Sequence, residues 1–204
     1  MLVLLVRHGV TPTTGTVLPG RAPGLHLAPR GVEQAEKAAR RLAPLPITAI
    51  HCSPLERTVE TAAPTAGRLG LTPVLDEGLL ECDFGDWTGR ELAELAKLPE
   101  WQTVQTDPAS FTFPGGEGFV AMQDRIVATL DRIAAAHPTG IVACFSHADP
   151  IKAALAHALG GGLSAFQRLW VSPASVSAIA WDADGTRGVR LTNSTTGSLR
   201  DLKP

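Results

Sequence analysis

The sequence predicts a three-layer α/β/α sandwich around a mainly parallel sheet with an antiparallel edge strand. Short apolar runs alternate with longer segments of helical periodicity, which is the pattern of parallel strands connected by helices. The first run, Leu2–Val6, is continuously apolar, as expected of a strand covered on both faces. Near the carboxyl end, Val176–Trp181 and Val189–Thr192 flank the turn-forming segment 182–185, which predicts a hairpin at the edge of the sheet.

The remaining elements follow from local patterns. Residues 11–29 are rich in proline and glycine and predict a long loop, and loops of this length are commonly functional. Residues 29–43 repeat apolar side chains at helical spacing and predict an amphipathic helix. Further strands are expected at 47–52, 71–75 and 140–145, and further helices at 91–98, 118–136 and 150–159.

A helix after the second strand has a marked start signal. Ser53 is a favoured N-cap residue, and Pro54 follows it at the first helical position. We expect this helix to run toward Arg68 and to be kinked or shortened by Pro64.

Length and composition limit the class of protein. The 204 residues are predicted to form one domain, 1–204, in which an irregular insertion at about 77–117 covers the substrate. A formal net charge of −2 does not favour a general binder of nucleic acid or membrane surfaces, and no apolar run approaches the roughly 20 residues of a membrane helix. The three cysteines lack metal or disulfide spacing, so we expect a cytoplasmic protein with no metal and no cofactor.

Polar side chains follow four of the predicted strands. Arg7 and His8 come after the first strand, Arg57 lies one turn into the helix after the second, Glu81 follows the third, and His147 follows the strand at 140–145. Since the carboxyl ends of parallel strands share one edge of a sheet, we expect these side chains to meet. Taken singly, each has an ordinary structural explanation, such as a surface turn or a capped helix start.

This set of side chains suits a phosphomonoester. Arginine matches phosphate oxygens bidentately and keeps its charge. A neutral imidazole at His8 can attack phosphorus and hold the phosphoryl group covalently, while His147, if protonated, adds positive charge. A carboxyl group at Glu81 can protonate the departing alkoxide and then activate water.

Six segments in chain order resemble the signature motifs of the histidine phosphatase superfamily, which includes the phosphoglycerate mutase-like enzymes. They are 5–11, 26–35, 53–62, 80–89, 114–117 and 146–147. The resemblance implies the same fold, with His8 as the phosphorylated nucleophile and Glu81 as the proton donor. It also implies that the phosphoryl group is held by Arg7, Arg57 and His147.

The chain departs from the family pattern at two positions near the expected phosphate. Thr14 stands where the family often has asparagine, and we expect its hydroxyl to bind phosphate in that place. Ala148 stands where a glycine often follows the second histidine, and alanine fits unless the backbone there needs positive φ.

The sequence favours a phosphatase over a mutase. Phosphoglycerate mutases of the family carry a longer insertion whose basic residues hold the substrate's carboxylate. Here 89–117 is short and contains only Arg90 and Lys97 as cations. We therefore expect a metal-independent phosphatase for a small phosphomonoester, with a phosphomutase as the first alternative. A non-catalytic protein that binds or senses a phospho-ligand is the second, although intact His8 and Glu81 argue against it.

Aromatic residues in the insertion are candidates for the substrate-facing wall or, alternatively, for the core of a small cap. The principal candidates are Phe84, Trp101 and Phe113, followed by Phe111, Phe119, Arg90 and Arg125. A homodimer is the one assembly that the sequence suggests, through the hairpin edge near Trp170 and Trp181.

Overall fold

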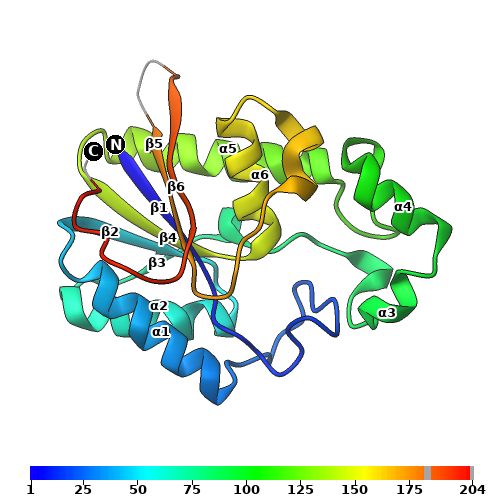
Figure 1. Ribbon diagram of the computed structural model, residues 1–204, viewed down its shortest axis with the longest axis horizontal. Helices are drawn as coiled ribbons and strands as arrows, with labels where there is room; N and C mark the ends of the chain where they lie inside the picture. The colour runs from blue at the N-terminus through cyan, green and yellow to red at the C-terminus, as the bar shows by residue number, and fades with distance from the viewer. Residues whose placement is uncertain (182–184, 203–204) are drawn as a thin grey trace.

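A six-stranded sheet crosses the molecule between two layers of helices (Figure 1). The computed structural model describes residues 1–181 and 185–202. The strands lie in the order β3-β2-β4-β1-β5-β6. They are β1 (Leu2–Arg7), β2 (Ile47–Cys52), β3 (Val74–Leu75), β4 (Ile141–Ser146), β5 (Val176–Trp181) and β6 (Arg187–Ser194).

The pairing of the strands confirms the predicted α/β class. β1 pairs in parallel with β4, and β2 pairs in parallel with both β4 and β3. β5 runs antiparallel to β1, and β6 runs antiparallel to β5, so the carboxyl-terminal hairpin forms the antiparallel edge. Most of the predicted turn at 182–185 lies outside the described residues.

Two pairs of helices cover the two faces of the sheet. α1 (Pro29–Leu42) and α2 (Glu56–Leu69) lie on one face, and α5 (Phe119–Ala136) and α6 (Ala148–Ala158) lie on the other (Figure 1). Side chains of β1 alternate between these layers. Leu4 is buried in the core that includes α1 and α2, whereas Leu5 is buried in the core that includes α5 and α6.

The segment predicted to cover the substrate projects beyond one end of the sheet (Figure 1). It contains two α-helices, α3 (Leu92–Leu95) and α4 (Pro99–Thr106), and the short 3₁₀ turns Glu77–Leu79, Gly85–Trp87 and Pro108–Ser110. Its aromatic rings pack on one another; the Phe84 and Phe113 rings, for example, meet edge to face at 4.9 Å between centroids. Burying these rings stabilises a segment that has little regular structure.

Several element boundaries differ from the sequence prediction. The expected strand 71–75 shortens to Val74–Leu75, where both side chains are exposed at the edge of the sheet. The expected helix 91–98 shortens to α3, and α4 was not predicted although Pro99 occupies its first turn. The expectation that Pro64 shortens α2 was wrong, because the helix continues to Leu69 with one face packed in the core.

The start of α2 is also displaced from the prediction. The helix begins at Glu56 with Leu55 as its N-cap, so Ser53 does not cap it. The Ser53 hydroxyl is instead hydrogen-bonded to Nε2 of His147, at 2.8 Å. A side chain with helix-capping propensity is therefore used to hold a histidine.

The suggested dimer edge is only partly consistent with the structure. Trp170 is 76% exposed, but Trp181 is buried, and its indole N–H donates to Asp131 at 2.8 Å. Trp181 therefore cannot contribute a dimer surface, and assembly through Trp170 remains a prediction. In the described part of the chain, no helix has the length and apolar character needed to cross a membrane.

Candidate active site

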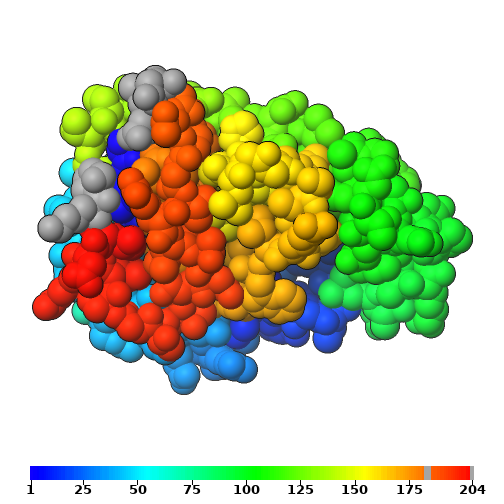
Figure 2. All heavy atoms as spheres, turned by 45° about the horizontal axis from the view of Figure 1, so that its top comes forward, coloured from blue at the N-terminus to red at the C-terminus, as the bar shows by residue number. Residues whose placement is uncertain are grey.

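Loops after β1 and β4 and the insertion meet at the carboxyl edge of the sheet and enclose a cavity of about 210 Å³. Figure 2 shows an opening where the blue loop after β1, the green insertion and the yellow-to-orange segment from α6 onward come together. Five of the predicted site residues line this cavity, namely Arg7, His8, Thr14, Glu81 and Phe84. Two others, Arg57 and His147, are fully buried next to His8.

Glycines allow the loop that carries His8 to pack tightly. A Cβ atom on Gly9 would lie 2.6 Å from the carbonyl oxygen of Gly31, and a Cβ on Gly31 would lie 2.2 Å from that of Val10. These contacts are too short for any side chain, so the start of α1 can approach the loop only with glycine at both positions. The Gly9 amide also donates to the Thr61 hydroxyl at 3.0 Å, which links the loop to α2.

The His8 ring is held in a form suited to nucleophilic attack. Its Nδ1–H donates to the carbonyl oxygen of Gly9 at 2.7 Å, which leaves Nε2 without a proton. Burial lowers the pKa of His8 to about 3, and the charges on Arg7 and Arg57 add to the effect. The imidazole is therefore neutral at physiological pH, with a free lone pair on Nε2.

The two arginines retain unused hydrogen-bond donors around His8. Arg7 Nη1 donates to the carbonyl of Val171, and Arg57 Nη2 donates to that of Gly20, both at 2.7 Å. Within the described residues, no partner is found for Nε of Arg7 or for Nε and Nη1 of Arg57, although all three atoms are buried. Because buried donors are costly when unpaired, this arrangement favours an anion that accepts from them.

His147 packs beside His8 with the ring centroids 5.3 Å apart. Its Nε2 is hydrogen-bonded to the hydroxyls of Ser53, at 2.8 Å, and Thr58, at 3.3 Å. Burial, followed by the neighbouring groups His8, Arg57 and Arg7, lowers the pKa of His147 well below its ordinary value. His147 is therefore neutral in this state. The positive charge that a protonated His147 would have added to the site is absent.

Glu81 has the electrostatic properties of a general acid. Its carboxylate is nearly buried and accepts one hydrogen bond, from the Cys82 amide at 3.0 Å. Burial, and next the negative charge of Asp149, raise the pKa of Glu81 to about 7 against the opposing effect of Arg57 and Arg7. A carboxyl group with this pKa can carry a proton at neutral pH and release it during a reaction.

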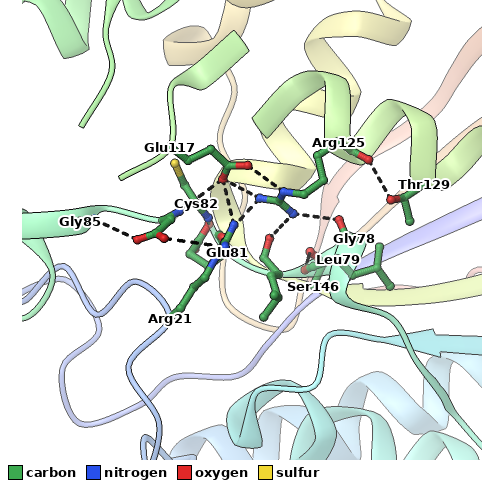
Figure 3. Close-up of polar contacts among 12 residues, drawn as sticks. Arg21, Gly78, Leu79, Glu81, Cys82, Gly85, Glu117, Arg125, Thr129 and Ser146 are labelled. Carbon is green, nitrogen blue, oxygen red and sulfur yellow. Dashed lines mark hydrogen bonds and ion pairs between the residues drawn. The ribbon is translucent and has the colours of Figure 1, made fainter. Parts of the chain in front are cut away.

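The backbone of Glu81 is clamped by two arginines that share one carboxylate (Figure 3). Arg21 Nε donates to the Glu81 carbonyl at 2.8 Å, and Arg125 Nη2 donates to it at 3.3 Å. Arg125 also holds the carbonyls of Gly78 and Leu80, each at 2.9 Å. Its side chain therefore ties α5 to the acid and to the segment that precedes it.

Glu117 joins the two arginines of this clamp. Its Oε2 accepts from Arg21 at 3.0 Å and from Arg125 at 2.8 Å, and its Oε1 accepts from Arg125 at 2.9 Å. Although burial opposes ionisation, the hydrogen bond and charge of Arg125 bring the pKa of Glu117 below its ordinary value. Glu117 is therefore ionised, and the three side chains form a charged network beneath Glu81.

Replacing Arg125 with methionine is expected to destabilise the protein by about 1–3 kcal/mol and to misplace Glu81. The loss should appear as a lower thermal midpoint together with a larger fall in kcat for alkyl phosphates than for nitrophenyl phosphate. Arg132→Met is a matched control on α5, because Arg132 is 60% exposed and bonds to Asp76. If Arg132→Met also lowered kcat more for alkyl phosphates than for nitrophenyl phosphate, a role of the clamp in placing Glu81 would be contradicted.

The remaining candidate residues are distributed between the cavity and the core. The Thr14 hydroxyl lines the cavity and accepts from the Thr11 amide at 2.8 Å, and binding of phosphate by Thr14 remains a prediction. Trp101 and Phe113 line a second, adjoining cavity together with Phe84. Neither cavity is lined by Arg90, Arg125 or Phe111.

Sequence reasoning missed several residues that contact the site. No local pattern distinguishes Arg21 or Asp149 from surface charges. Glu117 was noticed only as part of a motif, and Ser53 was assigned to the wrong task. Over residues 1–181 and 185–202, no cluster of three or more histidine, cysteine, aspartate or glutamate side chains has the arrangement of a metal site.

The fold and the site together define an α/β protein in which buried guanidinium donors, unpartnered among the described residues, surround a neutral histidine. The model of the histidine phosphatase superfamily (branch 1) matches residues 3–194, and the chain belongs to this superfamily. The family resemblance found in the sequence is thus confirmed.

Known relatives include phosphatases. The chain is 39% identical over 197 residues to a Mycobacterium tuberculosis protein named as bifunctional. The match covers 95% of this chain and 54% of the relative, so the chain spans about half the length of that protein. It is 31% identical over 182 residues to phosphoserine phosphatase 1 of Hydrogenobacter thermophilus, covering 87% and 85% of the two chains. The alpha-ribazole phosphatase structure from Shigella flexneri matches with a TM-score of 0.85 and 25% identity over 98% and 99% of the chains.

Proposed function

We propose that the protein is a metal-independent phosphomonoester phosphatase that acts through a phosphohistidine at His8. One observation carries the proposal: a neutral histidine with a free Nε2 lies among buried guanidinium donors for which the described residues supply no partner. A phosphoryl group would satisfy these donors while its phosphorus faces the nucleophile. The phosphatases among its relatives support the same reaction class.

In the first step, the lone pair on His8 Nε2 forms a bond to phosphorus, and the bond from phosphorus to the ester oxygen breaks. The electron pair of that bond stays on the leaving oxygen, which takes the proton from the Glu81 carboxyl group. Arg7 and Arg57 hold the phosphoryl oxygens as their charge develops, and the charges of these guanidinium groups take the place of a metal ion.

In the second step, water releases the phosphoryl group. The Glu81 carboxylate, now deprotonated, removes a proton from a water molecule whose oxygen bonds to phosphorus. The bond between phosphorus and His8 Nε2 breaks, and its electron pair returns to the ring. Inorganic phosphate leaves, with both His8 and Glu81 restored to their starting protonation states.

The substrate is proposed to be a small phosphorylated metabolite in the cytoplasm. The two adjoining cavities are about 210 and 170 Å³, which suits a leaving group of metabolite size. Phe84, Trp101 and Phe113 line the second cavity, which supports a substrate-facing role for them. Phe84 and Phe113 are also buried in the core of the insertion, the alternative that the sequence left open. Hydrolysis of a panel of sugar phosphates, nucleotides, phosphoamino acids and phosphoglycerates would identify the leaving group.

A phosphomutase is the second candidate, because the family also includes phosphoglycerate mutases. The only cationic side chains that line the two described cavities are Arg7 and Lys152, which leaves few groups to retain a substrate carboxylate. With phosphoglycerates, we expect release of inorganic phosphate and little isomerisation, measured by phosphate assay and by NMR. Fast isomerisation with little free phosphate would establish the mutase instead.

A further inference from the structure

A second cavity of about 170 Å³ adjoins the phosphate cavity at Leu18, Phe84 and Asp149, which line both. Most of its wall is apolar and aromatic. Its polar lining consists of Gln105, Asp149, Lys152 and Gln167. A leaving group that extends from a phosphate at His8 into this cavity therefore passes beside Asp149.

The Asp149 carboxylate has unused capacity to accept hydrogen bonds. Asp149 lies in the first turn of α6, two residues after His147, and its side chain is 22% exposed. Its one ion pair is with Lys152, at the long distance of 3.8 Å, and it accepts no hydrogen bond from any other residue that the structure describes. Two oxygens are thus available to a donor on the ligand.

Lys152, which lines the second cavity but not the first, balances this charge. Its Nζ donates to Oε1 of Gln167 at 2.9 Å and lies 3.9 Å from the ring centroid of Phe166. The side chain is 13% exposed, so the ammonium group is held by the protein. The opposite charges of Asp149 and Lys152 make the second cavity neutral overall. Of the two residues, Asp149 also lines the cavity that contains His8.

We propose that Asp149 determines which leaving groups the site accepts: it accepts a hydrogen bond from a hydroxyl group close to the ester and disfavours a carboxylate in that place. This inference rests on the proposed phosphatase function. It defines the substrate class as hydroxylated, uncharged leaving groups, such as sugars and polyols. The corresponding phosphorylated acids are poor substrates because their second anion would face Asp149.

The electrostatics of the site agree with this placement. After burial, the Asp149 charge is the largest influence that raises the pKa of Glu81 to about 7, and Asp149 also raises the pKa of Arg7 against the effect of burial. Asp149 therefore acts on both the acid that protonates the leaving oxygen and an arginine that binds the phosphate. A leaving group that lies between Glu81 and Arg7 is therefore also close enough to interact with the charge of Asp149.

Glycerol 3-phosphate and 3-phosphoglycerate test the inference, because they share a skeleton and differ in a hydroxymethyl group against a carboxylate. We expect the unmodified protein to favour glycerol 3-phosphate in kcat/KM. Asp149→Asn should reduce this preference about tenfold or more, because it removes the repulsion and leaves Lys152 unbalanced. Lys152→Met should increase the preference. Changes in the pKa of Glu81 affect both substrates and cancel in the ratio.

Asp124→Asn is the matched control, since Asp124 is exposed on α5 and lines neither cavity. It should leave the ratio unchanged. If Asp149→Asn kept its thermal midpoint and showed the same ratio of kcat/KM values as the unmodified protein, the inference would be overturned. The proposed phosphatase function would be unaffected by that result.

Binding measured by calorimetry separates this inference from the reaction itself. The His8→Ala protein should bind both esters without turnover, and Asp149→Asn in that background should shift the ratio of Kd values in the same direction. If the unmodified protein hydrolysed neither ester, the proposed function would be rejected. If the ratio of Kd values were the same in His8→Ala and in His8→Ala with Asp149→Asn, the role of Asp149 would be rejected.

Discussion

Replacing His8 with alanine is expected to lower kcat by about 10⁴-fold or more while the protein stays folded. The change removes the imidazole that would form the proposed bond to phosphorus, whereas the neighbouring His147 stays fully buried and hydrogen-bonded through Nε2 to Ser53 and Thr58. The buried donors of Arg7 and Arg57 remain, so the variant should still bind phosphate or vanadate. Steady-state kinetics and calorimetry with these anions measure the two effects.

His157→Ala is the matched control for this variant. His157 is exposed in the last turn of α6, at the opposite end of that helix from His147. Its replacement should leave kcat unchanged. Rapid mixing with substrate, followed by mass analysis under alkaline conditions that preserve phosphohistidine, should detect a phosphorylated protein only where His8 is intact. Substantial turnover by His8→Ala would reject the covalent mechanism.

Replacing Glu81 with glutamine is expected to reduce kcat about 10²- to 10⁴-fold for alkyl phosphates. An alkoxide is a poor leaving group that needs the proton of Glu81, whereas nitrophenolate leaves without one. The loss for nitrophenyl phosphate should therefore be much smaller when phosphorylation limits the rate. Glutamine keeps the shape of the side chain and leaves the Arg21 and Arg125 contacts to the backbone unchanged.

The pH profile provides an independent measurement of the same group. Since the pKa of Glu81 is raised to about 7, the protonated acid predominates below this pH and is lost above it. The rate with alkyl phosphates should thus fall as the pH rises through about 7, and Glu81→Gln should lack this dependence. Glu100→Gln, at an exposed position of α4, should retain the profile of the unmodified protein. If Glu81→Gln lowered kcat equally for alkyl phosphates and for nitrophenyl phosphate, Glu81 would not be the general acid.

Much of the site could be predicted because it depends on a simple property of parallel sheets. Arg7, His8 and His147 follow strands whose apolar patterns are clear, and the carboxyl ends of such strands face the same edge. Arg57 was found through its predicted position one turn into the helix after β2, although that helix begins at Glu56 and Arg57 is its second residue. In these cases a local pattern and one rule of topology were sufficient.

Other features could not be predicted because they depend on how distant loops pack. Arg21 and Glu117 are 96 residues apart in the chain and meet only because the loop before α1 packs against the insertion. Sequence patterns also suggested that Ser53 caps a helix, since a short hydroxyl has that propensity wherever the chain allows it. Packing of His147 beside β2 decides the contact instead.

The sequence by itself determined the α/β class, the superfamily and the candidate residues at the carboxyl edge of the sheet, because these follow from periodic strands and motifs at their ends. The tertiary structure decided the chemical state of those residues. Burial among arginines keeps the His8 imidazole neutral, and burial beside Asp149 raises the pKa of Glu81 to about 7. Desolvation and Coulomb energies depend on distances between side chains from separate segments, and only the folded chain defines those distances.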